Sequence, residues 1–302
     1  MYHYLMTGQP DSRTAVLNLT QWMVNLHDGS RGLFAQLLAV KKQEVPKLKA
    51  LARGEQPNTH RYPFTRGTGN YLTALVDAAI LEPDKGWLEK AGQVIRDTIH
   101  PGDDITARNL LDVEIGWSYL ILLSAIARFL WIKRQYQQID ESYLYTYEGF
   151  LKYAGWIKAN ERPFLQEPGQ LEFANDTWVA QDIRKAMLLF NAAELTKGAE
   201  AEGYQETART WLEQTCRTLD NSPEKNFSRI LIILAQNYGP QHSEYEDPTE
   251  HITASSAGDH FAGRPLLTWG QLAARIIQRI GLGITQFRPA RERAWLDARM
   301  NR

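Results

Sequence analysis

Apolar residues recur at intervals of three and four along most of the chain, which is the spacing of one face of an α-helix. Clear examples are the sets Val16, Leu19, Met23 and Leu26, then Leu72, Leu75, Val76 and Ala79, and later Met187, Leu188, Phe190 and Ala193. Alternation of apolar and polar residues, which is typical of a strand, extends over no more than a few residues. The pattern therefore predicts an all-α protein.

Short turns between helices alternate with much longer connections. The short turns end one helix and start the next, and they lie at 4–11, 79–86, 129–150 and 193–198. Their uneven spacing of roughly 50 to 75 residues is typical of helical hairpins with variable loops. The long connections are rich in proline and lie at 54–66, 100–106, 160–176 and 239–264. Hairpins stacked side by side would place short turns on one side and long loops on the other.

The helices that follow long loops are more apolar than their partners. Residues 109–132, 178–195 and 227–238 carry little charge, whereas 84–98 and 200–219 have a strongly polar face. This difference predicts an inner and an outer ring of helices, an (α/α) toroid formed by residues 1–302 as a single domain. Residues 1–6 are typical of the last turn of an inner helix, so we expect a ring that is incomplete at its N-terminus.

One pair of segments resembles a known group of families. The run Arg66–Leu72 (RGTGNYL) is followed by Pro83–Ala91 (PDKGWLEKA). This resembles glycan-active toroids, in which an Arg/Gly-led inner helix precedes a turn and an outer helix with Tyr/Trp-Leu-x-x-Ala. The six-hairpin glycosidases and the toroid domains of polysaccharide lyases are such families. The resemblance implies a lyase or glycoside hydrolase that acts on a polysaccharide or oligosaccharide. The alternative is a non-catalytic helical module or scaffold that binds a glycan or a protein.

The amino-acid composition limits the classes of ligand and partner that this chain could bind. The 302 residues include 34 Lys and Arg against 35 Asp and Glu, and a net charge of -1 argues against a general nucleic-acid binder. The single cysteine, Cys216, excludes an internal disulfide and a cysteine-cluster zinc site. Nine Trp, 13 Tyr and 10 Phe would suit contact with sugar rings, although large helical cores also use aromatic residues.

The most apolar segment, 117–132, is too short for a membrane span. It has 16 residues and includes Arg128, whereas a spanning helix needs about 20 apolar residues. We therefore expect a buried core helix and no membrane span. The first six residues lack a basic region and a long apolar stretch, so no signal peptide is visible. A complete chain of this kind would be cytoplasmic.

Three clusters of side chains could carry chemistry at the mouth of the toroid. The first contains His60, Tyr62, Arg66 and Asn70. Arg66 and Asn70 could neutralise a uronate carboxylate, while Tyr62 or His60 could remove a proton and protonate the leaving oxygen. The alternative is a loop whose aromatic residues pack and whose arginines pair with acids.

The second cluster contains Asp112, Glu114 and Trp117, with Arg128 on the same side of one predicted helix. A buried Glu114 needs a partner or a function, because a lone buried carboxylate is costly. We expect its pKa to be raised, which would suit a general acid. Asp112 could instead form a helical i,i+4 ion pair with Arg108.

The third cluster contains Asn175, Asp176 and Trp178 at the start of another predicted helix. A carboxylate beside an indole face is suited to holding a sugar, and the helix N-terminus would keep Asp176 ionised. Asn175 and Asp176 could equally be N-cap residues. One turn further on, Asp182 could pair with Lys185 at i,i+3.

No cofactor or metal motif stands out. The chain has no P-loop and no Gly-x-Gly-x-x-Gly. Residues 242–260 contain three histidines and several acids, but their spacing matches no known metal-binding loop, and a polar loop is the simpler interpretation. We therefore predict no cofactor and no metal, with catalytic roles for Asp176, Glu114, His60 and Tyr62.

Overall fold

The structure is a computed structural model that describes residues 1–29, 32–166, 168–223, 228–242, 261, 263 and 266–300. Of these described residues, 76% are helical and none lies in a strand, so the all-α prediction is confirmed. None of the described helices has the length and the apolar content to cross a membrane. Most of the histidine-containing segment predicted as a polar loop, residues 243–260, lies outside the described residues.

The chain divides into two compact units, and each is described by itself. Unit 1 comprises Met1–Pro63, Thr73–Thr98 and Arg264–Arg302, and unit 2 comprises Phe64–Leu72 and Ile99–Gly263. The single domain and the toroid that the sequence predicts stay predictions.

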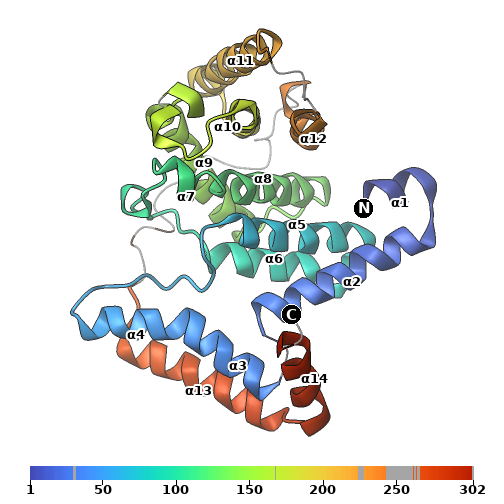
Figure 1. Cartoon of the computed structure of the whole chain (residues 1–302), viewed down its shortest axis with the longest axis vertical. Helices are drawn as coiled ribbons and strands as arrows, with labels where there is room; N and C mark the ends of the chain where they lie inside the picture. The colour runs from blue at the N-terminus through green and yellow to red at the C-terminus, as the bar shows by residue number, and fades with distance from the viewer. Residues whose placement is uncertain are drawn as a thin grey trace. The chain divides into compact units, whose positions relative to one another are not determined.

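Unit 1 contains the two ends of the chain. Its α-helices are α1 (Tyr2–Thr7), α2 (Pro10–His27), α3 (Leu33–Ala39), α4 (Val45–Ala52), the last part of α5 (Arg66–Leu81), α6 (Trp87–Arg96), α13 (Trp269–Thr285) and α14 (Pro289–Met300). A π-helical turn, Val40–Glu44, joins α3 to α4, and Pro46 lies in the first turn of α4. Figure 1 shows α3 and α4 lying along α13.

Polar contacts join the helices of unit 1. The Glu292 carboxylate in α14 accepts hydrogen bonds from the backbone N–H groups of Leu33 (2.9 Å) and Phe34 (3.0 Å). It thereby caps the first turn of α3 from a distant part of the chain. The Thr20 hydroxyl of α2 donates to the Ala74 carbonyl of α5 (2.9 Å). These contacts tie both ends of the sequence into the unit.

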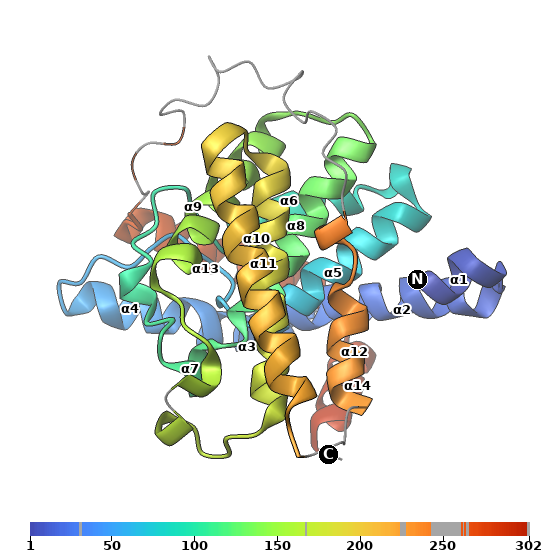
Figure 2. The ribbon, with the colours of Figure 1, turned by 90° about the horizontal axis from the view of Figure 1, so that it is seen from above.

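Unit 2 is organised around one central helix. Its α-helices are α7 (Val113–Gly116), α8 (Tyr119–Gln135), α9 (Glu141–Asn160), α10 (Asp176–Leu195), α11 (Gly198–Asp220) and α12 (Ser228–Asn237), with the first turns of α5. The helix α10 contacts α8, α9, α11 and α12, and nearly every residue from Val179 onward is buried. It forms an antiparallel hairpin with α11 (Figure 2). Gly198, with φ of 56°, lies at the turn, where a glycine adopts the left-handed region without strain.

The apolar segment 117–132 forms most of α8, and most of its residues are buried as predicted, although Trp131 is about half exposed. The helix predicted over 109–132 is nevertheless interrupted before it. Asn109 has a φ of 50°, and the short α7 ends at Gly116. A side chain at Gly116 would come within 2.8 Å of the Leu110 carbonyl oxygen, so the chain folds back on itself here. Glu114 and Arg128 therefore lie on different helices, and the predicted mixed stripe is wrong.

Candidate functional site

Buried charges gather where α10 meets the segment that follows α9. The Lys185 ammonium in α10 lies 2.9 Å from Glu161 Oε2 and 3.0 Å from Asp182 Oδ1. The Tyr119 hydroxyl donates a hydrogen bond to Glu161 Oε1 (2.5 Å). These four side chains, Lys185, Asp182, Glu161 and Tyr119, are called the Lys185 network. The predicted i,i+3 pair of Asp182 and Lys185 is therefore confirmed.

The same ammonium holds the loop that crosses α10. Lys185 Nζ donates to the Arg162 carbonyl (2.5 Å) and lies 3.3 Å from the centre of the Phe164 ring. The Phe164 backbone N–H donates in turn to the Asp182 carboxylate (3.2 Å to Oδ2). Every charged atom of the network thus has a close partner, which is the condition under which buried charges are tolerated.

Burial sets the protonation of the network. It raises the pKa of Asp182 to about 6, although Lys185 opposes the shift and Glu161 adds to it. Burial, with Glu161 beside it, also raises the pKa of Tyr119 well above its usual value, so the phenol remains a neutral donor. Asp182 therefore changes its charge near pH 6.

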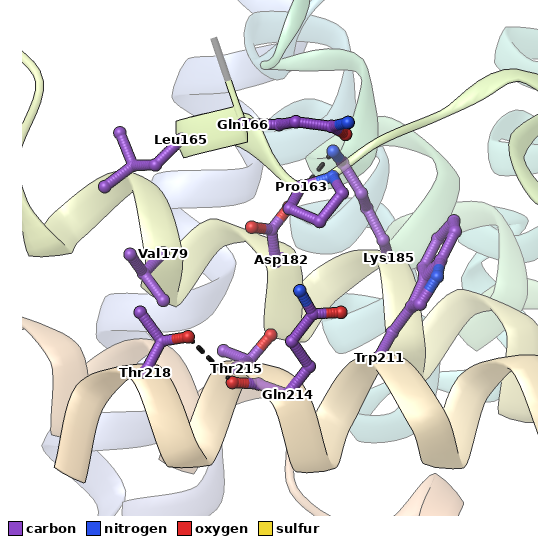
Figure 3. Close-up of a pocket in the computed structure, with 10 residues that line it drawn as sticks. All are labelled: Pro163, Leu165, Gln166, Val179, Asp182, Lys185, Trp211, Gln214, Thr215 and Thr218. Atoms are coloured by element: carbon purple, nitrogen blue, oxygen red, sulfur yellow. Dashed lines mark hydrogen bonds and ion pairs between the residues drawn. The ribbon is translucent and has the colours of Figure 1, made fainter. Parts of the chain in front are cut away.

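A cavity of about 490 Å³ opens over this network. We call it the α10–α11 cavity, and its lining consists of Pro163, Leu165, Gln166, Val179, Asp182, Lys185, Trp211, Gln214, Thr215 and Thr218 (Figure 3). Figure 3 shows Gln214 pointing from α11 toward the Asp182 and Lys185 side chains. Glu161 and Tyr119 are not among the lining residues. A buried acid and a buried ammonium thus share the wall of a cavity with amides, hydroxyls and one indole.

A smaller cavity of about 160 Å³ lies beside the first turns of α10, and we call it the tryptophan cavity. Its lining is Glu114, Trp117, Phe173, Asn175, Thr177, Trp178, Gln181 and Arg229. The Trp117 and Trp178 rings meet edge to face with centroids 6.0 Å apart. The Glu114 carboxylate accepts a hydrogen bond from the backbone N–H of Glu172 (3.3 Å).

The structure brings four of the sequence-predicted residues around this tryptophan cavity: Glu114, Trp117, Asn175 and Trp178. Asn175 is also the N-cap of α10, because its side chain accepts a hydrogen bond from the Thr177 N–H (2.9 Å). Glu114 is exposed, so the buried environment expected for it is wrong.

Other predicted residues of unit 2 have different surroundings. The Asp176 carboxylate accepts a hydrogen bond from the Ser222 hydroxyl and does not line either cavity. Asp112 precedes α7 without a capping bond from its side chain. Arg66 and Asn70 lie on α5 and are exposed.

The expected Arg108–Asp112 ion pair is replaced by another. Arg108 Nη2 lies 2.6 Å from Asp103 Oδ2, and the Tyr153 hydroxyl donates to the same oxygen (2.9 Å). Arg108 and Asp112 are not neighbours on a helix because Asn109 takes a left-handed conformation between them. The Arg108 guanidinium lies 4.3 Å from the centre of the Phe64 ring.

His60 and Tyr62 belong to unit 1. His60 is buried, and the Tyr62 hydroxyl donates a hydrogen bond to Asp28, which also pairs with Lys90. Within unit 1, these two residues therefore belong to a packed, hydrogen-bonded segment, as the alternative interpretation of the first cluster expected.

Sequence reasoning missed Glu161, Tyr119 and the cavity above Lys185. A usable signal was present, because Asp182 and Lys185 interrupt the most apolar part of 178–195 with opposite charges at i,i+3. Among the described residues, no group of three or more His, Cys, Asp or Glu side chains could hold a metal ion.

Comparison of the chain with protein-family models, curated proteins and solved structures gave no match.

Proposed function

We propose that the α10–α11 cavity binds a carbohydrate and that Asp182 exchanges a proton with the bound sugar. The observation that carries this proposal is the position of the Lys185 network in the cavity wall. A carboxyl group with a pKa of about 6 faces a space of about 490 Å³, within the size range of small-molecule sites. Near neutral pH such a group can accept a proton and return it.

The lining of the cavity suits hydroxyl groups. Gln166 and Gln214 each offer an amide donor and acceptor, and Thr215 and Thr218 add hydroxyls. Trp211 adds an indole, whose apolar face can contact the C–H face of a pyranose ring. The Thr218 hydroxyl already donates to the Gln214 carbonyl (2.9 Å) and can still accept a hydrogen bond. A polyhydroxylated ligand can pair with these donors and acceptors, which an apolar ligand cannot do.

The charge of the network selects among carbohydrates. Two carboxylates, Asp182 and Glu161, surround one ammonium, so the network carries an excess negative charge above pH 6. A uronate carboxylate in this cavity would be repelled, whereas a neutral sugar or an amino sugar would not. The cavity therefore favours the hydrolase type of chemistry over the lyase type, which requires a uronate.

A non-catalytic carbohydrate-binding module is the second candidate. Glycoside hydrolysis commonly needs two carboxyl groups that flank the scissile bond. Only Asp182 of the two network carboxylates lines the cavity, and Glu161 does not. This observation favours binding without turnover.

An (α/α) toroid is the arrangement that we propose for the helical hairpins. The α10–α11 hairpin supports it, because α10 is almost entirely buried whereas only Tyr204, Ala208, Thr215 and Leu219 are buried in α11. This is the difference expected between an inner and an outer helix. A crystal structure without a closed or nearly closed ring would contradict this arrangement.

Saturation-transfer NMR with neutral, amino and uronate oligosaccharides tests the binding proposal. We expect binding of the neutral or amino sugars, and loss of at least tenfold in affinity in Trp211→Ala and Gln214→Ala. Trp131→Ala is the matched control, because Trp131 on α8 is about half exposed (48%) and does not line the cavity. Binding of none of the three classes, or equal losses in all three variants, would refute the proposal.

Asp182→Asn separates the two candidates. Retained binding with lost release of reducing ends identifies Asp182 as the proton-transfer group. Retained binding in a protein that never releases reducing ends identifies a binding module.

A further inference from the structure

Unit 1 contains a second group of charged side chains, gathered around the loop that precedes α5. The Lys47 ammonium of α4 donates a hydrogen bond to the Asn58 carbonyl (3.2 Å). The Arg275 guanidinium of α13 donates to the next carbonyl, that of Thr59 (3.0 Å). Arg61 follows two residues later. Three cations from three segments therefore converge on residues 58–61.

Backbone bonds fix this loop in place. The Leu267 N–H, just before α13, donates to the Pro57 carbonyl (3.1 Å), and Asn58 forms an antiparallel bridge with Leu266. At the other end, the Arg61 N–H donates to the Asp97 carbonyl (2.7 Å). These main-chain contacts hold the backbone of Arg61 and the two carbonyls to which Lys47 and Arg275 donate.

Nearby acids do not balance the charge. The interacting group consists of the cations Lys47, Arg61, Arg275 and Arg279 and the acids Glu44 and Asp97. Arg279 Nε lies 3.6 Å from Glu44 Oε1, and Arg61 Nε lies 3.7 Å from Asp97 Oδ1. Both distances exceed those of a good charge-assisted hydrogen bond. The group therefore holds four positive charges against two negative ones when all are ionised.

Three buried polar atoms of the group make no hydrogen bond within the part of the chain that the structure describes: both carboxylate oxygens of Glu44 and one donor, Arg61 Nε, whose ion-pair partner Asp97 Oδ1 lies 3.7 Å away. Leaving a buried guanidinium donor without a hydrogen bond is costly, and a bound acceptor would remove that cost. The surroundings also shift one pKa of the group. Burial, and next the charge of Arg275, lowers the pKa of Lys47 to about 8.

We propose that Lys47, Arg61 and Arg275 form a binding site for a tetrahedral oxyanion, a phosphate or sulfate group. The two guanidinium groups are planar donors that can bind two oxygens of such a group at once, and the ammonium adds a compact positive charge. This site belongs to unit 1 and is independent of the carbohydrate proposal for unit 2.

Isothermal titration calorimetry with sodium sulfate tests the site, because sulfate does not titrate near neutral pH. An anion favours the charged form of Lys47, so we expect uptake of about half a proton per bound sulfate at pH 8, where Lys47 is half neutral. Two buffers with different ionisation enthalpies measure that uptake. At pH 9 the affinity should be about tenfold weaker than at pH 7, because only about one Lys47 in eleven is then charged.

Variants and anions complete the test. Lys47→Gln and Arg275→Gln should each abolish the proton uptake or the binding, while Lys49→Gln, an exposed lysine on the same helix, should retain both. Circular dichroism establishes that each variant is folded. A parallel titration with inorganic phosphate at pH 7 identifies which of the two oxyanions binds more tightly.

Several results would overturn the proposal. Sodium chloride at the same ionic strength should give no saturable heat, and an equal response to chloride would mean charge screening only. An equal loss of sulfate binding in Lys49→Gln would likewise mean charge screening only. No binding of sulfate or phosphate with a Kd below about 10 mM by the folded protein would exclude the site.

Discussion

Removing the Lys185 ammonium should reveal how strongly the buried network depends on it. Lys185→Met keeps most of the side-chain volume and removes the charge. The side chains of Lys185, Glu161 and Asp182 are only 1%, 3% and 8% exposed. The variant therefore leaves two carboxylates in a desolvated environment without their cation. Breaking a buried ion pair on one side costs about 3–5 kcal/mol of the free energy of unfolding.

Lys133→Met is the matched control, because Lys133 is also a buried lysine in unit 2. Its side chain is 6% exposed, but the carboxylate that it pairs with at 2.6 Å, Asp140, is 55% exposed. Water can hydrate Asp140 once the ammonium is gone. We therefore expect Lys133→Met to cost at most about 1 kcal/mol, the value for an exposed ion pair.

Urea denaturation followed by circular dichroism at pH 5 and pH 8 measures both variants. The cost of Lys185→Met should be smaller at pH 5, where the carboxylates left in the variant can take up protons and shed their charge. Adding Asp182→Asn to Lys185→Met should recover part of the loss, since one uncompensated charge disappears. Equal costs for Lys185→Met and Lys133→Met, or a cost that does not change with pH, would refute the reasoning.

Three further predictions concern unit 2 and one helix of unit 1. The folded protein binds a proton at Asp182 more tightly than the unfolded chain does. The free energy of unfolding, relative to that of Asp182→Asn, should therefore fall by at most about 3 kcal/mol from pH 4 to pH 6 and then level off. Urea denaturation at each pH measures this fall. Asn175→Ala should lower the free energy of unfolding by about 1 kcal/mol, because the N-cap of α10 is lost. Asp176→Asn should lower it little, because an amide oxygen can also accept the Ser222 hydrogen bond. A larger loss in Asp176→Asn than in Asn175→Ala would contradict this assignment. Gly69→Ala should lower the melting temperature, because its Cβ would lie 2.7 Å from the backbone of α8, whereas Gly281→Ala in the open part of α13 should raise it.

The sequence predicted most of what depends on local spacing. The helical class, the burial of 117–132 and the Asp182–Lys185 pair all follow from residues three and four apart, which share a helix face in any tertiary arrangement. The N-cap role of Asn175 is likewise a local property of one helix end.

The break before α8 could not be read from the same spacing. Residues 109–116 are compatible with a helix by periodicity, and the break depends on the left-handed Asn109 and on the contact of Gly116 with Leu110. Both features are set by how the segment folds back on itself. The helical stripe that grouped Glu114 with Arg128 was wrong for that reason.

Contacts between residues that are distant in the sequence could not be predicted from spacing either. Glu161 follows α9 and reaches Lys185 only because the loop 161–166 crosses α10. The proposed oxyanion site in unit 1 depends in the same way on Lys47, Arg61 and Arg275, which belong to three separate segments. Charges that meet through tertiary structure leave no periodic pattern in the sequence.

The two charged clusters have opposite imbalances, and this fixes the pH range in which each should bind. In unit 2, Asp182 adds a second negative charge above pH 6, which favours a neutral or amino sugar over an acidic one. In unit 1, Lys47 keeps its positive charge below pH 8, which favours an oxyanion. Between pH 6 and pH 8 both imbalances are present. In one buffer, the α10–α11 cavity should therefore discriminate against uronates and the unit 1 site should bind sulfate. Below pH 6 the uronate discrimination should weaken while sulfate binding persists, and above pH 8 the reverse should hold. Two binding assays across this range would therefore separate two sites that a single measurement at pH 7 would not.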